Sequence, residues 1–409
     1  MTDLRIADVR VTPIAFADPP LLNNSGCHQP YALRSIIEVE TEGGIVGLGE
    51  SYGSKSILDG LAAVAAQCPG LRVTDINGLR RVAHSLRNAG DESSMRRIVG
   101  AIEVAMWDAH GKTTGQRVCD LLGGQVRETV PFAAYLFYKF AGHAGVGAED
   151  AWGEVLSPEQ LVDEARGMIE AHGFRAIKLK GGILEPDSEI AGLNALRAAF
   201  PDAPLRIDPN GGWSLHTTLG LLPRLEGLVE YLEDPTLGID AMAAVQAKTD
   251  IPLATNMCIV APEHLPPGLA QRAVRVILSD HHFWGGLAAS RELARICAIW
   301  GIGLSMHSNS HLGISLAAMT HLAASTPNLT HDCDTHYPWQ TDEVIEGGKL
   351  IFHNGALSVP EGPGLGVSLD RQALARLHHN YTNHGYGTRD DESEMQKHQP
   401  NWRFERPRY

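Results

Sequence analysis

The sequence predicts an α/β protein in which a barrel of parallel strands follows a smaller α+β unit. Three observations lead to this prediction. The chain has 409 residues, which exceeds one ordinary compact domain and suits a barrel with a second domain. Short apolar runs alternate with amphipathic stretches from about residue 132 to residue 360. Polar residues close these runs at nearly constant intervals.

The composition excludes several classes of protein. Hydrophobic residues make up 44% and charged residues 20%, as in soluble globular enzymes, so disorder is not expected. We find no apolar run that could span a bilayer and no signal-peptide core in the first residues, so we expect a cytoplasmic protein. The six cysteines form no CxxC pair, which favours reduced thiols over a zinc site or disulfides. A formal net charge of −14 argues against binding to nucleic acid.

Residues 1–130 are predicted to form an α+β capping domain. Two extended stretches, LRIADVRVTPIAF and YALRSIIEVETEGGIVGLGESY, indicate a short antiparallel sheet with a Glu-Gly-Gly turn. Helical segments follow, among them SMRRIVGAIEVAMWDAHGKTTG, which ends in a glycine-containing stop.

Residues 131–366 are predicted to form the barrel. Its strands are the runs PFAAYLF, FRAIKLK, PLRIDPN, LVEYLEDP, IPLATN, VRVILSD, GIGLSMHS and LTHDCDTH. Each is short and almost continuously apolar before a polar end, as expected of parallel strands that are covered on both faces. Helical stretches such as EIAGLNALRAAF and LAASRELARICAIW, with apolar residues at three- and four-residue spacing, separate them.

The polar residues that close these runs follow one another at intervals of 23 to 28 residues: Lys180, Asp208, Glu233, Asn256, Asp280, His307 and Asp334. One strand, one helix and two loops have this length. The repeat therefore predicts a TIM-like barrel of (β/α)7β type, whose strand ends converge on one catalytic face. A doubly wound sheet alternates similarly but would not bring seven consecutive strand ends round one centre.

Two segments depart from the barrel rhythm. The polar, histidine-rich residues 367–409 are expected to return and pack against the capping domain. The glycine-rich stretch AGHAGVGAEDAWGEV within residues 140–156 is interpreted either as a mobile loop over the barrel mouth or as a simple surface insertion.

Lys178 and Lys180 are candidate catalytic residues. Residues i and i+2 of a strand point the same way, so both lysines would project into the barrel. Two neighbouring ammonium groups lower each other's pKa, which would help one of them act as a base near neutral pH. The alternative is an edge strand with two solvated lysines, which the apolar FRAI before them and Gly181-Gly182 after them disfavour.

Asp208, Glu233 and Asn256 close three consecutive strands and are candidate metal ligands. Oxygen-only ligands suit a hard cation, so the predicted cofactor is Mg²⁺. Any one of these residues alone would more often be a helix cap or a salt-bridge partner. Because Asn256 is neutral, we hypothesise that the site tolerates a substrate with extra negative charge.

Asp280 and His307 close the next two strands and are expected to be neighbours. A carboxylate bonded to one ring nitrogen fixes the histidine tautomer and raises the basicity of the other nitrogen, which predicts a second acid–base group. Ser308 and Asn309 beside His307 favour this interpretation over a structural histidine.

These motifs resemble those of glucarate dehydratases in the enolase superfamily. The resemblance is carried by KLKGG (178–182), DPNGGW (208–213), LEDP (232–235), ATNM (254–257), SDHHFWGG (279–286) and MHSNSHLG (306–313). It extends to NNSGCHQP (23–30), DTHYPWQ (334–340) and RDDESEMQ (389–396), and so covers nearly the whole chain.

The resemblance implies a role for each residue of the predicted centre. Lys180 would remove the proton α to a carboxylate, while Lys178 would stabilise the enediolate and depress the pKa of Lys180. Asp208, Glu233 and Asn256 would hold Mg²⁺. His307, paired with Asp280, and Asn309 would act from the opposite face. This use of a lysine or histidine base with Mg²⁺ is a known pattern of the superfamily.

The resemblance also implies the substrate, a sugar diacid such as D-glucarate or L-idarate, and the residues around it: His28, Tyr135, Asn210, Ser308, His336 and Arg389. Arg389 would grip a carboxylate through two hydrogen bonds; its alternative is a solvated charge beside Asp390 and Asp391. Such cations would offset the negative net charge locally. A small-molecule substrate and a homo-oligomer are expected, with no nucleic-acid or membrane partner.

The chain departs from the family pattern after the first barrel strand, after Glu233-Asp234-Pro235, at the glycine pair of SDHHFWGG and between Arg87 and Met95. Galactarate or an aldonate therefore stays open as substrate. Two other classes are weighed against the dehydratase. A Schiff-base aldolase would use Lys178 or Lys180 and leave the acidic strand ends unexplained. An inactive sugar-acid binder would be expected to have lost a base or a ligand.

Overall fold

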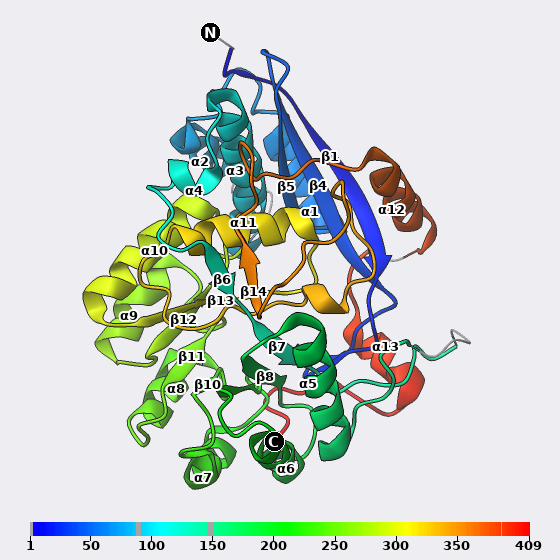
Figure 1. Cartoon of the computed structure of the whole chain (residues 1–409), viewed down its shortest axis with the longest axis vertical. Coiled ribbons are helices and arrows are strands. Elements are labelled where there is room, and N and C mark those ends of the chain that lie inside the picture. The colour runs from blue at the N-terminus through cyan, green and yellow to red at the C-terminus, as the bar shows by residue number, and fades with distance from the viewer. Residues whose placement is uncertain (1–2, 87–90, 146–149, 386) are drawn as a thin grey trace.

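The computed structural model describes residues 3–86, 91–145, 150–385 and 387–409. A sheet with its helices forms one half of the molecule, and a barrel forms the other half (Figure 1). The mixed α/β class and the cap-plus-barrel arrangement are as the sequence predicts.

The first half is built on a three-stranded antiparallel sheet. Its strands β1 (Ile6–Ala17), β4 (Tyr31–Thr41) and β5 (Val46–Tyr52) lie in the order β1-β4-β5. The predicted Glu-Gly-Gly turn joins β4 to β5, and Gly44 takes a φ of 79° there. A small hairpin of β2 (Leu22–Asn23) and β3 (Gly26–Cys27) extends towards the barrel.

Helices cover one face of this sheet: α1 (Lys55–Ala65), α2 (Ile76–Ser85) and α3 (Glu92–Thr114), with the short α4 (Val118–Leu121) after them. Ile37, Leu61 and Ile102 belong to the shared apolar core. The helix α3 lies so close to β5 that a Cβ on Gly47 would meet the carbonyl oxygen of Ala105 at 2.0 Å. The predicted glycine stop is confirmed, since Gly115 ends α3 in a left-handed conformation.

Seven of the eight predicted runs form the parallel barrel strands: β7 (Ala133–Leu136), β8 (Ala176–Lys180), β9 (Leu205–Asp208), β10 (Tyr231–Glu233), β11 (Leu253–Thr255), β12 (Val276–Ser279) and β13 (Gly303–Met306). They pair in chain order. The helices between them are α5 (Pro158–His172), α6 (Pro186–Ala199), α7 (Leu215–Leu225), α8 (Gly238–Gln246), α9 (Leu265–Ala270), α10 (Leu287–Trp300) and α11 (Gly313–Ala324), with single 3₁₀ turns at Pro262–His264 and Tyr337–Trp339.

The eighth run, LTHDCDTH, closes the barrel without forming a full strand. On one side, Cys333 forms a bridge with Phe132, just before β7, through two backbone hydrogen bonds of 2.9 Å. On the other side, the amide of Asp334 donates to the backbone oxygen of Met306 of β13 at 2.9 Å. The amides of Thr330 and His331 both donate to Leu304, which breaks the regular ladder. The closure therefore rests on a few hydrogen bonds.

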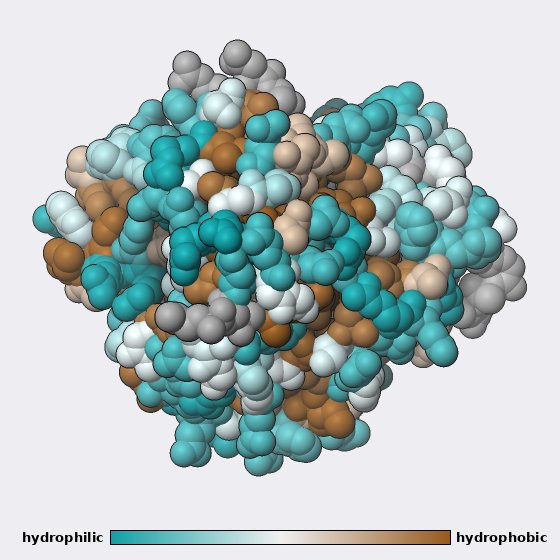
Figure 2. Space-filling view, turned by 90° about the horizontal axis from the view of Figure 1, so that it is seen from above, coloured by the Kyte–Doolittle hydropathy of each residue, from teal (hydrophilic) through white to brown (hydrophobic). Residues whose placement is uncertain are grey.

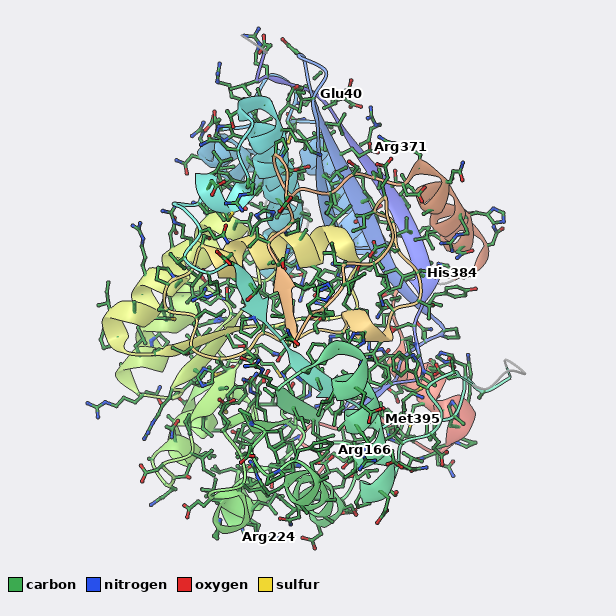
Figure 3. All side chains as sticks on the ribbon, viewed as in Figure 1. Glu40, Arg166, Arg224, Arg371, His384 and Met395 are labelled. Carbon is green, nitrogen blue, oxygen red and sulfur yellow. The ribbon has the colours of Figure 1, made fainter. Side chains whose placement is uncertain are left out.

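The C-terminal segment contacts both the capping domain and the barrel. The helix α12 (Arg371–Asn383) packs on β1, and α13 (Asp391–His398) packs on β3. Arg371, at the start of α12, faces the sheet, and Met395 lies on α13 (Figure 3). The last residues do not stay with the capping domain: Arg408 donates its amide to Gly212 at 2.8 Å, at the barrel. A separate two-stranded antiparallel sheet is formed by β6 (Thr129–Pro131), which directly precedes β7, and β14 (Ala356–Ser358).

The surface carries mixed polarity. On the face seen from above, hydrophilic residues cover most of the area and hydrophobic residues show in small groups between them (Figure 2). Within the described ranges, the helices are too short or too polar to traverse a bilayer.

Candidate active site

A cavity of about 740 Å³ lies between the barrel's strand ends, the capping domain and the C-terminal segment. The barrel contributes Lys180, Asn210, Asn256, His307, Ser308 and Asn309, and the cap contributes His28, Tyr52 and Arg97. Arg389 and Arg406 come from the C-terminal segment. Of the fourteen site residues predicted above, ten line this cavity; Lys178, Asp208, Glu233 and Asp280 lie buried behind its wall.

Both lysines of β8 point into the barrel. The ammonium of Lys178 is fully buried, 2.6 Å from a carboxylate oxygen of Glu233 and 2.6 Å from one of Asp334. Lys180 reaches the cavity and contacts Asp208 at 2.7 Å. The two amines therefore share a site but not an environment.

The predicted lowering of the Lys178 pKa is wrong for this structure. Burial by itself lowers that pKa, but Asp334 and Glu233 outweigh burial and hold it well above its ordinary value. The prediction considered the neighbouring lysine alone. It did not foresee that carboxylates from two other strand ends enclose Lys178.

The loop after β8 holds the two lysines in position. Gly182 has a φ of 73°, and a Cβ there would lie 2.3 Å from the carbonyl oxygen of Pro209, so glycine is required. Buried Glu189 of α6 accepts hydrogen bonds from the amides of Gly182 at 3.0 Å and Ile183 at 2.8 Å. Burial raises the pKa of Glu189 to about 7, although these amide hydrogen bonds by themselves lower it.

Two of the three predicted metal ligands contact the same ammonium group, since Nζ of Lys178 lies 2.6 Å from Glu233 and 3.5 Å from Asp208. Asn256 donates from its amide to Glu233 at 2.9 Å, and Tyr135 donates from its hydroxyl to Asp208 at 3.3 Å. Asn210, whose φ is 56°, donates its backbone amide to the second oxygen of Asp208. Since the nitrogen and oxygen of an asparagine amide are interchangeable by rotation, Asn256 can turn its oxygen to the same point.

Charge supports a divalent cation here. Four fully buried carboxylates, Asp208, Glu233, Asp234 and Asp334, lie with two contacting lysines. Burial raises the pKa of Asp234 to about 7 and that of Glu233 well above its ordinary value, although Lys178 opposes the shift of Glu233. Asp208, Glu233 and Asp334 each contact a lysine, whereas Asp234 accepts hydrogen bonds from the hydroxyl of Thr255 and the backbone amide of Asn256. The buried acids therefore outnumber the lysines that contact them. This donor set fits Mg²⁺.

The predicted pairing of Asp280 with His307 is present, with Nδ1 of His307 2.8 Å from the carboxylate. His282 contacts the other carboxylate oxygen through its Nδ1 at 3.0 Å. Burial by itself raises the Asp280 pKa, but the two histidines hold it well below its ordinary value. With Nδ1 donating to Asp280, Nε2 of His307 is left to act as acid or base.

Arg34 supports this pair from the capping domain and was not found from the sequence. It donates to Glu50 at 3.0 Å, to the side-chain oxygen of Asn309 at 3.2 Å and lies 3.2 Å from Nε2 of His282. The same Nε2 of His282 also lies 3.2 Å from the backbone oxygen of Glu50 and 3.1 Å from the hydroxyl of Ser315. No periodicity marks such a contact between distant segments.

The predicted substrate-binding residues occupy defined positions around the cavity. His28 pairs with Asp18 at 3.0 Å, and Ser308 accepts the backbone amide of His336 at 3.1 Å. Nδ1 of His336 is buried without a hydrogen-bond partner among the described residues, and burial holds its pKa well below the ordinary value. Its ring packs on the ring of Tyr135, with centroids 4.8 Å apart.

Arg389 lines the cavity but is already engaged. It donates two hydrogen bonds of 2.6 Å to the carboxylate of Asp391, which also accepts from Asn23 at 2.8 Å. Asp391 raises the pKa of Arg389 against the effect of burial. Arg389 therefore makes the pair of hydrogen bonds that was expected for a substrate carboxylate with Asp391 of the same chain.

The stretch between Arg87 and Met95 and the glycine-rich stretch 140–156 lie partly outside the described residues, at 87–90 and 146–149. Ser93, within the first segment, lines the cavity. In the described part of the glycine-rich stretch, His143 contacts the backbone oxygen of Asp18 at 2.8 Å, and Trp152 packs on Trp339. The described residues of this stretch do not line the cavity.

An α+β cap over a barrel, with lysines, acids and a histidine at the strand ends, defines a cap-and-barrel enzyme whose site lies at the carboxyl ends of the strands. Residues 7–123 match the N-terminal domain of mandelate racemase and muconate lactonizing enzymes, and residues 160–373 match the enolase C-terminal domain-like family. The chain belongs to the enolase superfamily.

Similar proteins span the whole chain. A probable glucarate dehydratase of Streptomyces coelicolor is 47% identical, over 98% of this chain and 97% of that protein. An enolase from Mycobacterium smegmatis complexed with tartrate is 52% identical, with a TM-score of 0.96 over 99% of this chain and 98% of the other. An enolase from Gibberella zeae complexed with magnesium, formate and sulfate is 49% identical, with a TM-score of 0.97 over 100% and 98%.

Proposed function

We propose that the protein is a Mg²⁺-dependent acid-sugar dehydratase that converts D-glucarate, or its epimer L-idarate, to 5-dehydro-4-deoxy-D-glucarate. One observation carries the proposal. Lys180 and His307 face one cavity from β8 and the end of β13, buried Asp280 holds the ring of His307, and the buried oxygen ligands lie on the strands between. The similarity to a probable glucarate dehydratase supports the choice of substrate.

The residues divide the reaction into two proton transfers. Nζ of Lys180 takes the proton from the carbon α to the carboxylate, and the electrons of the C–H bond enter the carboxylate as an enediolate. Lys178, held protonated by Glu233 and Asp334, stabilises the negative charge that develops there. Asp208, Glu233 and Asn256 would hold Mg²⁺, which supplies Lewis-acid stabilisation of the same charge.

His307 completes the elimination. The enediolate electrons form the carbon–carbon double bond as the β-hydroxyl leaves, and Nε2 of His307 donates a proton so that water is released. Asp280 stabilises the histidine in its protonated form and fixes the ring through Nδ1. The enol product then tautomerises to the 2-keto acid.

The test is turnover of a panel of aldaric and aldonic acids by the full chain, with Mg²⁺ and with EDTA, assayed as 2-keto acid. We expect product from D-glucarate that EDTA abolishes. The Arg81→Gln variant is the control, since Arg81 is 71% exposed on α2 and pairs with Asp75. Metal-dependent product from galactarate or an aldonate alone would contradict the named substrate, and no product from any acid would overturn the dehydratase.

The competing aldolase is disfavoured by the surroundings of Lys178. An imine needs an unprotonated amine, whereas Lys178 lies between two carboxylates that hold its pKa well above the ordinary value. Borohydride trapping of substrate on either lysine would favour the aldolase.

A further inference from the structure

Among the residues that the structure describes, four arginines line the cavity, and they differ in what they already bind. Arg389 donates twice to Asp391, and Arg406 donates to the side-chain oxygen of Asn24 at 2.6 Å. Arg96 donates to the backbone of Phe283 at 3.0 Å and to Glu263 at 3.2 Å. Across the described parts of the chain, the guanidinium of Arg97 makes no ion pair and no hydrogen bond.

Arg97 is nevertheless held in one place. Its guanidinium carbon lies 5.0 Å from the ring centre of Tyr52 and 4.9 Å from that of Phe283. Its Nε is buried and lacks a hydrogen-bond partner among the described residues. Aromatic faces stabilise a guanidinium without using its N–H donors, so the donors are left for a ligand in the cavity.

Both aromatic residues connect Arg97 to the reaction centre. The ring of Phe283 stacks on the ring of His307, with centroids 5.2 Å apart and planes at 25°. The hydroxyl of Tyr52 accepts a hydrogen bond from Asn309 at 2.5 Å. Arg97 therefore belongs to the His307 side of the cavity.

The lysines lie on the other side. In the barrel, β13 and β8 are separated by β9 to β12 in one direction, and by β7 and the Cys333 segment in the other. A ligand whose reacting carboxylate lies at Lys178 and Lys180 and that extends past His307 would bring its far end to Arg97.

We propose that Arg97 is the specificity-determining residue that binds the second carboxylate of the substrate, and that it selects dicarboxylic over monocarboxylic sugar acids. This inference rests on the proposed function. A carboxylate is the group that an arginine with free donors binds most strongly, and it would satisfy the buried Nε. Arg389 is less suited to this role, because Asp391 already occupies its donors.

The experiment compares two ligands that differ only at the far end, D-glucarate and L-gulonate, which keeps the reacting carboxylate and carries a hydroxymethyl group in place of the other one. Calorimetry measures their binding to the Mg²⁺-loaded full chain carrying Lys180→Met, so that no turnover is needed. The comparison is made with Arg97 intact, with Arg97→Gln, with Arg97→Lys and with the exposed charge control Arg81→Gln.

We expect Arg97→Gln to weaken D-glucarate binding by about 10- to 100-fold and to leave L-gulonate and Mg²⁺ binding unchanged. Arg97→Lys should restore part of the loss, because it keeps the charge but not the planar donors. Equal loss for both ligands would indicate a merely structural role and overturn the inference, as would the absence of any D-glucarate preference with Arg97 intact. Failure of the dehydratase would show separately, as absent keto acid in chains with Lys180.

Discussion

Lys178 and Lys180 lie two residues apart on one strand, yet their surroundings give them different chemistry. Lys178 is fully buried between two carboxylates and stays protonated, which suits stabilisation of an anion. Lys180 reaches the cavity and has one carboxylate contact. This difference in access supports the proposal that Lys180 is the base.

Replacing Lys180 with methionine should remove the base and keep the shape of the side chain. We expect kcat to fall by about 10²- to 10⁴-fold while Mg²⁺ affinity is retained. The measurement is 2-keto acid formation, together with exchange of the α proton into deuterated water. Exchange at the rate of the unaltered chain would contradict the assignment of Lys180 as base.

The neutral ligand Asn256 offers a test of charge at the metal site. Asn256→Asp adds one negative charge beside Glu233, which should tighten Mg²⁺ binding and raise the KM for D-glucarate by about tenfold or more. Titration calorimetry with Mg²⁺ and steady-state kinetics measure the two effects. Tighter Mg²⁺ binding with an unchanged KM would show that ligand charge does not tune substrate binding.

Strand ends could be predicted from the sequence because their polar residues recur at a fixed step, and this step led to Lys180, Asp208, Glu233, Asn256, Asp280 and His307. Arg34 and Arg97 could not be predicted in the same way. Each reaches the site from the capping domain across a long sequence separation, and no local pattern indicates which barrel residue an arginine will meet.

At the scale of elements, the helix α6 fixes the loop after β8 through one carboxyl group. Glu189 accepts amide hydrogen bonds from that loop while fully buried, and its pKa is raised to about 7 from an ordinary 4.5. The folded chain keeps this proton to a higher pH than the unfolded chain does.

The sign of the resulting pH dependence follows from that difference. The contribution of Glu189 to stability is full below about pH 4.5 and is lost as the pH rises through about 7. The gap between these pKa values corresponds to about 3 kcal/mol. Glu189→Gln does not titrate, so its free energy of unfolding relative to the unaltered chain should rise by that amount between pH 4.5 and 8. Urea denaturation at both pH values measures it, and a constant difference would refute the expectation.

Elements differed in how well the sequence predicted them. The seven apolar runs are strands because their residues are buried on both faces. The run around Cys333 is a bridge, because Thr330 and His331 both bond to Leu304 and interrupt the ladder. The course of the last residues to Gly212 depends on individual backbone contacts that composition does not encode.

At the scale of the whole molecule, the buried carboxylates link cation binding to stability. Mg²⁺ should raise the melting temperature relative to EDTA, because a ligand that binds only the folded chain at 100 times its Kd adds about 2.7 kcal/mol. Differential scanning calorimetry measures this shift. Asp208→Asn should lose most of it, and an equal shift in that variant would place the cation elsewhere.

The two halves are joined by buried polar contacts. Glu50 of the capping sheet accepts the amides of Leu312 and Ser315 at 3.0 Å, next to Arg34. Glu103 of α3 accepts the amides of Leu287 and Ala288 at the start of α10. The cap therefore contributes to the shape of the barrel's reaction face, beyond covering it.

The position of α12 has a consequence for how the chain is made. It lies on β1, where His378 bonds to the backbone of Pro13, and Arg371 at its start pairs with Glu38 of the neighbouring strand β4. The strand β1 is thus covered by a helix that follows it by about 350 residues in the sequence. Contacts of such sequence separation form slowly, and uncovered strands aggregate. The sheet of β1, β4 and β5 is therefore expected to complete its folding only once α12 has been synthesised, and to depend on protection until then.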